Sequence, residues 1–278
     1  MTKHPFATAL SMVTAITIAA AALFLVWVSA TGVRPLIMET GSMSPSMPTG
    51  SLILVREAPV DSFAVGDVVA HQREAEGIVR VHRVIDIVEG STGPELVTAG
   101  DYSQTVDLFP ATSGSLYVGD VFYSSHVAGG LWKLAPYVLS ALIIASALAF
   151  VLSPSAAALA TGLLIALALA WGAMRTGAFI GIEGLETKLE GDTPVMVGVQ
   201  TGILPAEVQS GLDGDTVVAQ PGELFNLAGG PGAESIEVFA KATLSPQLLV
   251  LIFTPTVVIT AAQLISKLFT RRDRYTSV

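Results

Sequence analysis

Cysteine is absent from this chain of 278 residues. Its absence excludes disulfide bonds, thiol catalysis and cysteine-based zinc sites, although it does not decide the compartment. Basic residues are also few, because 14 Lys and Arg stand against 23 Asp and Glu and the net charge is -9. Phosphate contacts require clustered Lys and Arg, so we expect no nucleic-acid partner.

Charged residues make up only 13% of the chain and hydrophobic residues 51%, which is outside the usual range of a soluble domain. The apolar residues gather into blocks that approach or exceed the roughly 20 residues that cross a bilayer core. The first block, residues 6–30, is longer than the core of a signal peptide, so we interpret it as a retained anchor. Three more blocks follow at residues 135–152, 156–174 and 246–269. We therefore predict a membrane protein with about four transmembrane helices.

The basic residues that do occur lie mainly near the two ends of the chain. Lys3 precedes the first apolar block, and four Lys and Arg residues between 267 and 274 follow the last. Loops on the cytoplasmic side carry the excess of Lys and Arg, so we expect a multi-pass protein of the cell membrane with both termini in the cytoplasm. The acidic segments 31–130 and 176–245 would then lie on the outer face.

The two outer segments are both expected to be rich in β-structure. In residues 31–130, short runs of β-branched residues separated by Gly, Pro and Asp predict an all-β domain of roughly 100 residues. In residues 176–245, the alternation in SIEVFAKATL favours a small β-rich module. We interpret this module as a structural insertion, with a docking surface for a substrate or partner as the alternative. The remaining parts are an anchor (1–30), a helical hairpin (131–175) and a last helix with a basic tail (246–278).

The stretch ETGSMSPSMPTGS, residues 39–51, follows the first apolar block and contains a candidate nucleophile. A catalytic serine needs an exposed turn, a base and donors for the developing oxyanion. Gly41 removes side-chain bulk before Ser42, and the Ser42 backbone N–H and the Thr40 hydroxyl are close enough in sequence to face one oxyanion. Taken alone, however, a Ser/Pro/Gly loop after a membrane span is more often a simple connection.

Residues 31–130 contain no lysine, so the general base in this segment is expected to be a histidine. That segment contains three histidines, and imidazole is suited to proton transfer near neutral pH. His82 lies inside the longest β-rich run, where neighbours can fix its ring, whereas His71 ends a strand and is expected to be solvated. His126 lies close to the second span. A single strand histidine is nevertheless more often structural than catalytic.

A third group should orient the base, and the loop AGDYSQTVDLFP provides two carboxylates. These are Asp101 and Asp107. Asp86 is a weaker candidate, because it follows His82 by four residues on the same strand. An aspartate after glycine also commonly caps a bend, so turn formation is the structural alternative for the loop carboxylates.

Five motifs in this order resemble the type I signal peptidases: GSMSPSMPTGSLILV, VGDVVAH, VRVHRVIDI, VTAGDYSQTVD and LYVGDV. The resemblance is to the branch found in archaea, the endoplasmic reticulum and some Gram-positive bacteria, which pairs its serine with histidine. It implies that Ser42 is the nucleophile, His82 the general base, Asp101 part of the glycine-aspartate motif and Asp107 the catalytic aspartate. Thr40 falls on an oxyanion donor.

The chain departs from the family pattern at Ser44, Ser51 and Tyr102-Ser103, where other polar or acidic residues are frequent. These departures leave the division of roles between the two loop aspartates open. Ser44, Ser46 and Ser51 are interpreted as turn residues.

The resemblance also implies a fold and a substrate. The fold would be a membrane-anchored all-β catalytic domain, with additional transmembrane helices and the small outer module. The substrate strand would add to backbone at residues 36–39 and 77–81. The apolar side chains that would wall its pockets for small residues are Leu36, Ile37, Met38, Ile78 and Val79.

The expected activity is removal of N-terminal signal peptides from exported preproteins, with cleavage after small residues of the Ala-x-Ala type. No cofactor or metal is expected. The expected partners are the preproteins and the lipid bilayer, with association to the secretion machinery as a further candidate. The alternative function is a catalytically silent, membrane-anchored β-domain that acts as a scaffold or assembly factor in the cell envelope.

Overall fold

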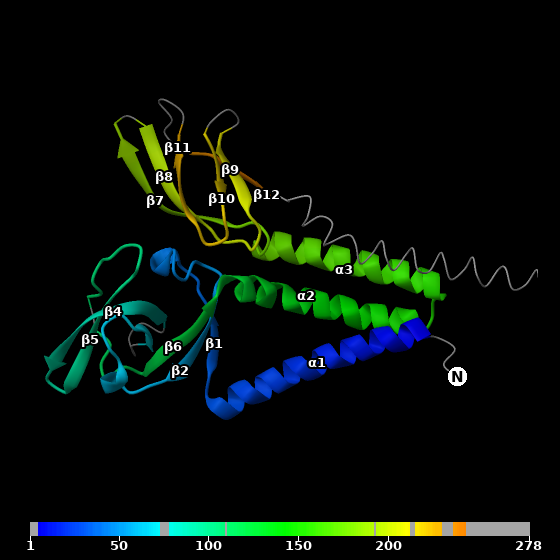
Figure 1. Cartoon of the computed structure of the whole chain (residues 1–278), viewed down its shortest axis with the longest axis horizontal. Helices are drawn as coiled ribbons and strands as arrows, with labels where there is room; N and C mark the ends of the chain where they lie inside the picture. Colours follow the sequence, from blue (N-terminus) through cyan, green and yellow to red (C-terminus); the bar gives the residue numbers. More distant parts are fainter. Residues whose placement is uncertain are drawn as a thin grey trace, which may run out of the picture. The chain divides into compact units, whose positions relative to one another are not determined.

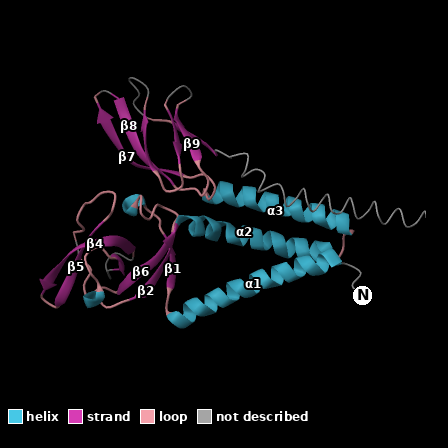
Figure 2. Cartoon of the chain, in the orientation of Figure 1, coloured by secondary structure: helices cyan, strands magenta, loops and turns pink. Residues whose placement is uncertain are grey.

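The computed structural model describes residues 5–72, 78–108, 110–191, 193–211, 215–229 and 236–242. Among these, residues 5–18 and 137–171 belong to one compact unit, and residues 19–136 and 172–242 belong to the other. Figure 1 labels α1, α2, α3 and most of the strands, and Figure 2 distinguishes the helical segments from the strands.

Three helices in the described part of the chain are long and apolar enough to cross a bilayer. They are α1 (Pro5–Thr31), α2 (His126–Ala149) and α3 (Pro154–Thr176). Two short 3-10 helices also occur, η1 (Gly41–Met43) and η2 (Val60–Ser62). The first three predicted spans are therefore confirmed as long, apolar helices. The protein is membrane-associated. The fourth predicted span, residues 246–269, lies outside the described residues.

The ends of α2 and α3 follow from their local sequences. The hydroxyl of Ser125 accepts a hydrogen bond from the Ala128 N–H at 3.1 Å, and this cap starts α2 nine residues before the apolar block predicted from the sequence. Pro154 occupies the first position of α3, where its missing N–H costs no helical bond. Gly177 follows the last residue of α3 with φ of 61°, a left-handed conformation that glycine adopts without steric cost.

The segment between α1 and α2 forms a six-stranded antiparallel sheet in the order β1-β2-β6-β3-β4-β5. The strands are β1 (Arg34–Ile37), β2 (Leu52–Glu57), β3 (Val68–Gln72), β4 (Val79–Gly90), β5 (Gly93–Ala99) and β6 (Tyr117–Ser125). The prediction of an all-β arrangement agrees with these strands. Its boundaries, 31 and 130, stay a prediction.

Both faces of this sheet are covered by apolar side chains. Val68 and Tyr117 belong to one buried cluster, whereas their neighbours Val69 and Val118 belong to another. Adjacent residues of a strand point to opposite faces, so the two clusters lie on the two sides of the sheet. The first cluster also contains Met43, which anchors the loop between β1 and β2.

The residues from 180 to 242 that the structure describes form a separate β-structure, here called the second β-module. Its strands are β7 (Ile182–Glu190), β8 (Thr193–Gln200), β9 (Ala206–Ser210), β10 (Thr216–Ala219), β11 (Leu224–Ala228) and β12 (Val238–Ala242). They form two three-stranded sheets, β11-β8-β7 and β10-β9-β12. Val208 of one sheet and Leu227 of the other share one buried cluster, so the two sheets pack face to face.

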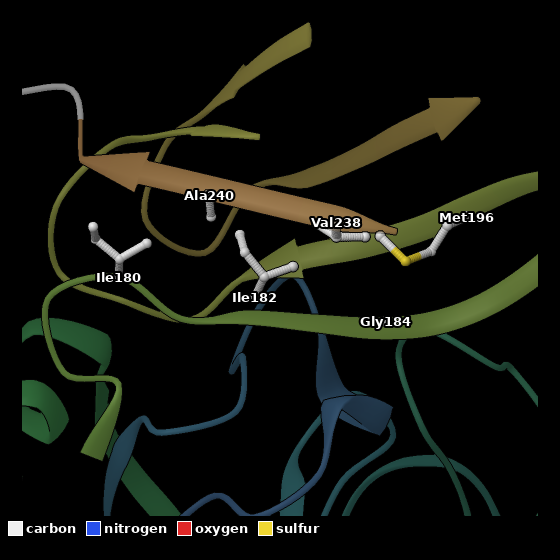
Figure 3. A pocket seen from close by; sticks show the side chains of 6 residues that line it. All are labelled: Ile180, Ile182, Gly184, Met196, Val238 and Ala240. Carbon is white, nitrogen blue, oxygen red and sulfur yellow. The ribbon is translucent and has the colours of Figure 1, made fainter. Parts of the chain in front are cut away.

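The second β-module also contains an open pocket of about 410 Å³. Figure 3 shows its lining, which comes from the β7 and β8 region and from β12. The lining residues are Ile180, Ile182, Gly184, Met196, Val238 and Ala240. Ile236 and Val238 pack against the module's core, as the alternation SIEVFAKATL predicted, but Ala240 is exposed.

Candidate active site

The loop between β1 and β2 is held firmly at both ends. At its base, the Met38 N–H donates to the Ser51 carbonyl at 2.9 Å, and the Gly50 N–H donates back to the Met38 carbonyl at 2.8 Å. In its middle, Met43 and Met47 are buried in the apolar cluster beneath the sheet. This loop, residues 38–51, contains the candidate nucleophile and is called the nucleophile loop below. Its many Ser and Pro residues therefore form an anchored turn.

Ser42 lies in the 3-10 helix η1 and contacts the imidazole of His82 on β4. The distance from Ser42 Oγ to His82 Nε2 is 3.1 Å. On the other side of the ring, His82 Nδ1 lies 2.6 Å from Asp107 Oδ2. The structure therefore brings together three of the side chains named from the sequence, in the order serine, histidine, aspartate.

Asp107 is the most enclosed member of this group, with 6% of its side chain exposed. Its carboxylate accepts hydrogen bonds from the Thr98 hydroxyl at 2.5 Å and from Arg80 at 2.8 Å, in addition to His82. Burial by itself would raise the pKa of Asp107. The hydrogen bonds from His82 and Thr98 outweigh this effect and lower its pKa to about 2. The carboxylate is therefore charged and fixed where it can orient His82.

Asp101 has different partners from Asp107. Both of its oxygens accept hydrogen bonds from the Arg83 guanidinium, each at 2.7 Å, and the Ser46 hydroxyl also donates to it. Burial opposes ionisation, but the hydrogen bonds from Arg83 and Ser46 lower the pKa of Asp101. Because Ser46 belongs to the nucleophile loop, Asp101 ties that loop to β4. Asp86, the weaker sequence candidate, instead accepts a bond from the next backbone N–H, that of Ile87, at 2.9 Å.

Gly100 is needed for the close approach of the end of β5 to Ser42 and His82. A Cβ atom at this position would lie 2.7 Å from the Ser42 carbonyl oxygen and 3.3 Å from His82 Nε2. The turn that follows Gly100 bonds the same Ser42 carbonyl oxygen, which accepts a hydrogen bond from the Tyr102 N–H at 2.9 Å. The Gly-Asp motif thus seats its loop directly against Ser42.

Thr40 and the Ser42 amide are the oxyanion donors predicted from the sequence, and both lie next to the Ser42 side chain. The Thr40 hydroxyl is 3.5 Å from Ser42 Oγ, and it does not cap η1, although Thr40 is the residue that precedes this helix. The Ser42 N–H belongs to the first turn of the helix, where amides have no partner within the helix. Both groups are therefore adjacent to the serine oxygen.

The predicted substrate-binding residues lie on two strand edges. Within the described strands, β1 pairs only with β2, and residues 79–82 of β4 pair only with β3. Leu36 and Ile37 are partly buried on β1, and Val79 is partly buried on β4. Ile78 precedes β4 with 69% exposure. Gly77 lies outside the described residues.

Met38 differs from the other four predicted pocket residues. It is buried within the apolar cluster of the sheet. Its side chain therefore belongs to the core beneath the site.

The two other histidines considered as the base, His71 and His126, have different neighbours from His82. His71 was expected to be solvated, but this was wrong: it is 2% exposed, because β3 lies between β6 and β4 in the sheet. His126 Nε2 bonds the Gly202 carbonyl at 2.8 Å. Lys133 lies against Gly50, at the base of the nucleophile loop.

Four contributing residues were not identified as such from the sequence: Thr98, Arg80, Arg83 and Ser46. Thr98 gives the clearest sequence signal, since it is a polar residue in the apolar end of β5, two residues before Gly100. Arg80 lies two residues before His82 and therefore points to the same face of β4. Ser46 had been assigned only a turn role, whereas its hydroxyl also bonds Asp101.

A serine, a histidine and an aspartate linked in this order form the arrangement that serine hydrolases use for acyl transfer. No protein-family model matches the chain. Signal peptidase I W of Bacillus subtilis (strain 168) is 36% identical over 74 residues, which are 26% of this chain and 38% of that protein. The match thus covers well under two thirds of the relative's length. It supports at most a relationship to the type I signal peptidases.

Proposed function

We propose that this protein is a membrane-bound serine endopeptidase that removes signal peptides from exported preproteins. The observation that carries the proposal is the hydrogen-bonded chain from Ser42 through His82 to Asp107. The partial similarity to Signal peptidase I W supports the substrate class. The use of histidine as base would place the protein in the archaeal and endoplasmic-reticulum type of these enzymes.

The proposed reaction begins with attack of Ser42 Oγ on the scissile carbonyl while His82 Nε2 accepts the hydroxyl proton. The negative charge that develops on the carbonyl oxygen is stabilised by the Ser42 N–H and the Thr40 hydroxyl. His82 then gives its proton to the leaving amine, which departs as the N-terminus of the mature protein. Water, deprotonated by His82, hydrolyses the remaining acyl ester and regenerates Ser42.

Asp107 supports both proton transfers without changing its own protonation. Its pKa of about 2 keeps it charged at neutral pH. It therefore holds the Nδ1 proton of His82, leaves Nε2 free to accept from Ser42, and stabilises the imidazolium that forms. Asp101 acts on structure, through Arg83 and Ser46.

The substrate would bind as an extended strand along the edges of β1 and of residues 79–82 that no other described strand pairs. Backbone hydrogen bonds at such edges give affinity, and pockets for alternate side chains give specificity. Leu36, Ile37, Ile78 and Val79 would line these pockets, with buried Met38 behind them. We propose small residues of the Ala-x-Ala type before the cut.

The apolar helices would place this site at the membrane. We propose a multi-pass protein of the cell membrane with both termini in the cytoplasm and the six-stranded sheet on the outer face. Anchoring confines enzyme and preprotein to one interface and raises their effective concentration.

The direct test uses the purified full-length protein in detergent and a preprotein with an Ala-x-Ala site. Mass spectrometry should show one cut after the last alanine. The preprotein with that alanine replaced by a bulky residue should remain intact. Cutting at unrelated positions, or no cutting by a folded protein, would reject the proposed substrate.

A further inference from the structure

The second β-module contacts the residue that precedes the nucleophile. A Cβ atom at Gly41 would overlap the Leu185 Cδ2 atom of β7. Gly41 does not adopt a left-handed backbone conformation, so its lack of a side chain is not required by its φ. The glycine is instead required by the close approach of Leu185.

Leu185 reaches this position because β7 carries a bulge. The register between β7 and β8 shifts between Gly184 and Glu186, which leaves Leu185 as the extra residue without a partner on β8. A bulge interrupts the alternation of a strand and redirects the side chain at that point. The local irregularity of β7 thus coincides with its contact to the nucleophile loop.

Two more contacts join the second β-module to the active-site loops. The Tyr102 hydroxyl donates to Glu186 at 3.1 Å, while the N–H of the same tyrosine holds the Ser42 carbonyl. Gly222 lies against the ring of Pro48: a Cβ atom at Gly222 would lie 3.3 Å from Pro48 Cγ. The module therefore contacts the nucleophile loop on both sides of Ser42.

We propose that the second β-module is a working part of the active site, in which Leu185 positions the nucleophile loop through Gly41. This inference rests on the proposed function and deepens it. Leu185 is a positioning residue: it fills the space beside Gly41 and fixes the η1 turn that aims Ser42 Oγ at His82. Displacement of a catalytic group by about 1 Å can reduce a rate by roughly 100-fold, so this support bears directly on turnover.

The contact can be tested by exchanging volume between its two sides. Gly41→Ala adds a methyl group where Leu185 lies, and Leu185→Ala removes the atoms that it would strike. Each single variant should lower kcat/KM, by about tenfold or more. The double variant should be more active than Gly41→Ala alone, because the truncated side chain leaves room for the added methyl group. Leu189→Ala is the control, since Leu189 lies on the same strand with 74% exposure, and it should stay within about twofold of wild type.

A second measurement separates positioning from substrate binding and from stability. The rate at which a small fluorophosphonate labels Ser42 should follow the same order of variants, although this probe makes no peptide contacts. Leu185→Met, which keeps the volume, should restore labelling, while a thermal unfolding scan reports any loss of folding. If Gly41→Ala does not fold, recovery of folding in the double variant demonstrates the same contact.

The inference is overturned if folded Leu185→Ala labels and cleaves at the wild-type rate. It is also overturned if the double variant shows only the product of the two single effects. A wild-type protein that labels at Ser42 but cuts no preprotein would reject the proposed substrate. In that case the labelling rates would still decide the role of Leu185.

Discussion

The two carboxylates in the loop after β5 illustrate how neighbours assign a role to a residue. Asp107 bonds His82, Thr98 and Arg80, whereas Asp101 bonds Arg83 and Ser46. The partners of Asp107 include the proposed base, His82. The partners of Asp101 join the nucleophile loop, through Ser46, to β4, through Arg83.

Replacement of each aspartate by asparagine should therefore affect catalysis differently. Asp107→Asn should lower kcat by roughly 1,000-fold or more, because the amide cannot hold His82 in the productive tautomer. Asp101→Asn should mainly lower the free energy of unfolding, by about 1–3 kcal/mol, because charge-assisted hydrogen bonds to Arg83 are weakened. Steady-state kinetics and denaturant unfolding of both variants provide the comparison. Equal losses of kcat at unchanged stability would contradict this division.

The pKa of Asp107 also predicts how stability depends on pH. Its folded-state pKa of about 2 is below the ordinary value of 3.8, so its stabilising contribution is fully present above that value. The contribution, about 2 kcal/mol, should be lost as pH falls from about 4 to 2. The difference in unfolding free energy between wild type and Asp107→Asn, measured across this range, should shrink with acidification. A constant difference would show that the carboxylate is not stabilised by its partners.

At the scale of elements, the site depends on the end of β5 approaching η1 closely. Gly100→Ala would place a methyl group 3.2 Å from Ser42 Cβ and 3.3 Å from His82 Nε2. It should therefore lower kcat/KM by roughly 100-fold by separating serine from histidine. Gly114→Ala is a matched control, because a Cβ there meets only Thr112 Oγ1 at 3.5 Å. Near-normal activity of Gly100→Ala would mean that the loop relaxes without cost.

The sequence predicts the elements better than it predicts contacts between them. The long apolar blocks identify α1, α2 and α3, and the β-branched runs identify the strands, because each pattern is local. The residues alone leave the choice among several serines, three histidines and two loop aspartates open, and the resemblance to the type I signal peptidases selects Ser42, His82 and Asp107. Their spacing along the chain does not by itself give their distances.

The remaining features depend on strand order and register. His71 is buried because β3 is flanked on both sides, which its position at the end of a short apolar run does not reveal. The pairing of Asp101 with Arg83 follows from the register of β4 against β5. Leu185 reaches Gly41 because of a bulge in β7. The two residues are 144 positions apart in the chain, and no local sequence pattern indicates such a contact.

At the scale of the whole molecule, membrane anchoring should favour substrates that are anchored too. In detergent micelles or lipid vesicles, a preprotein with its apolar segment should be cut faster than a short soluble peptide with the same site. Dilution with additional detergent or lipid should reduce this advantage, because enzyme and substrate then occupy different particles. Rates that do not change with such dilution would argue against confinement. The soluble peptide serves as the control, since its cleavage should be unaffected.

The central claim is that His82 activates Ser42 as the nucleophile of a peptidase. The most direct measurement is mass spectrometry of the intact full-length protein after reaction with a fluorophosphonate, followed by peptide mapping. We predict one adduct, located on Ser42, absent in Ser42→Ala and formed at least 100-fold more slowly in His82→Ala. Labelling at another serine, or equal labelling of Ser42 without His82, would contradict the account.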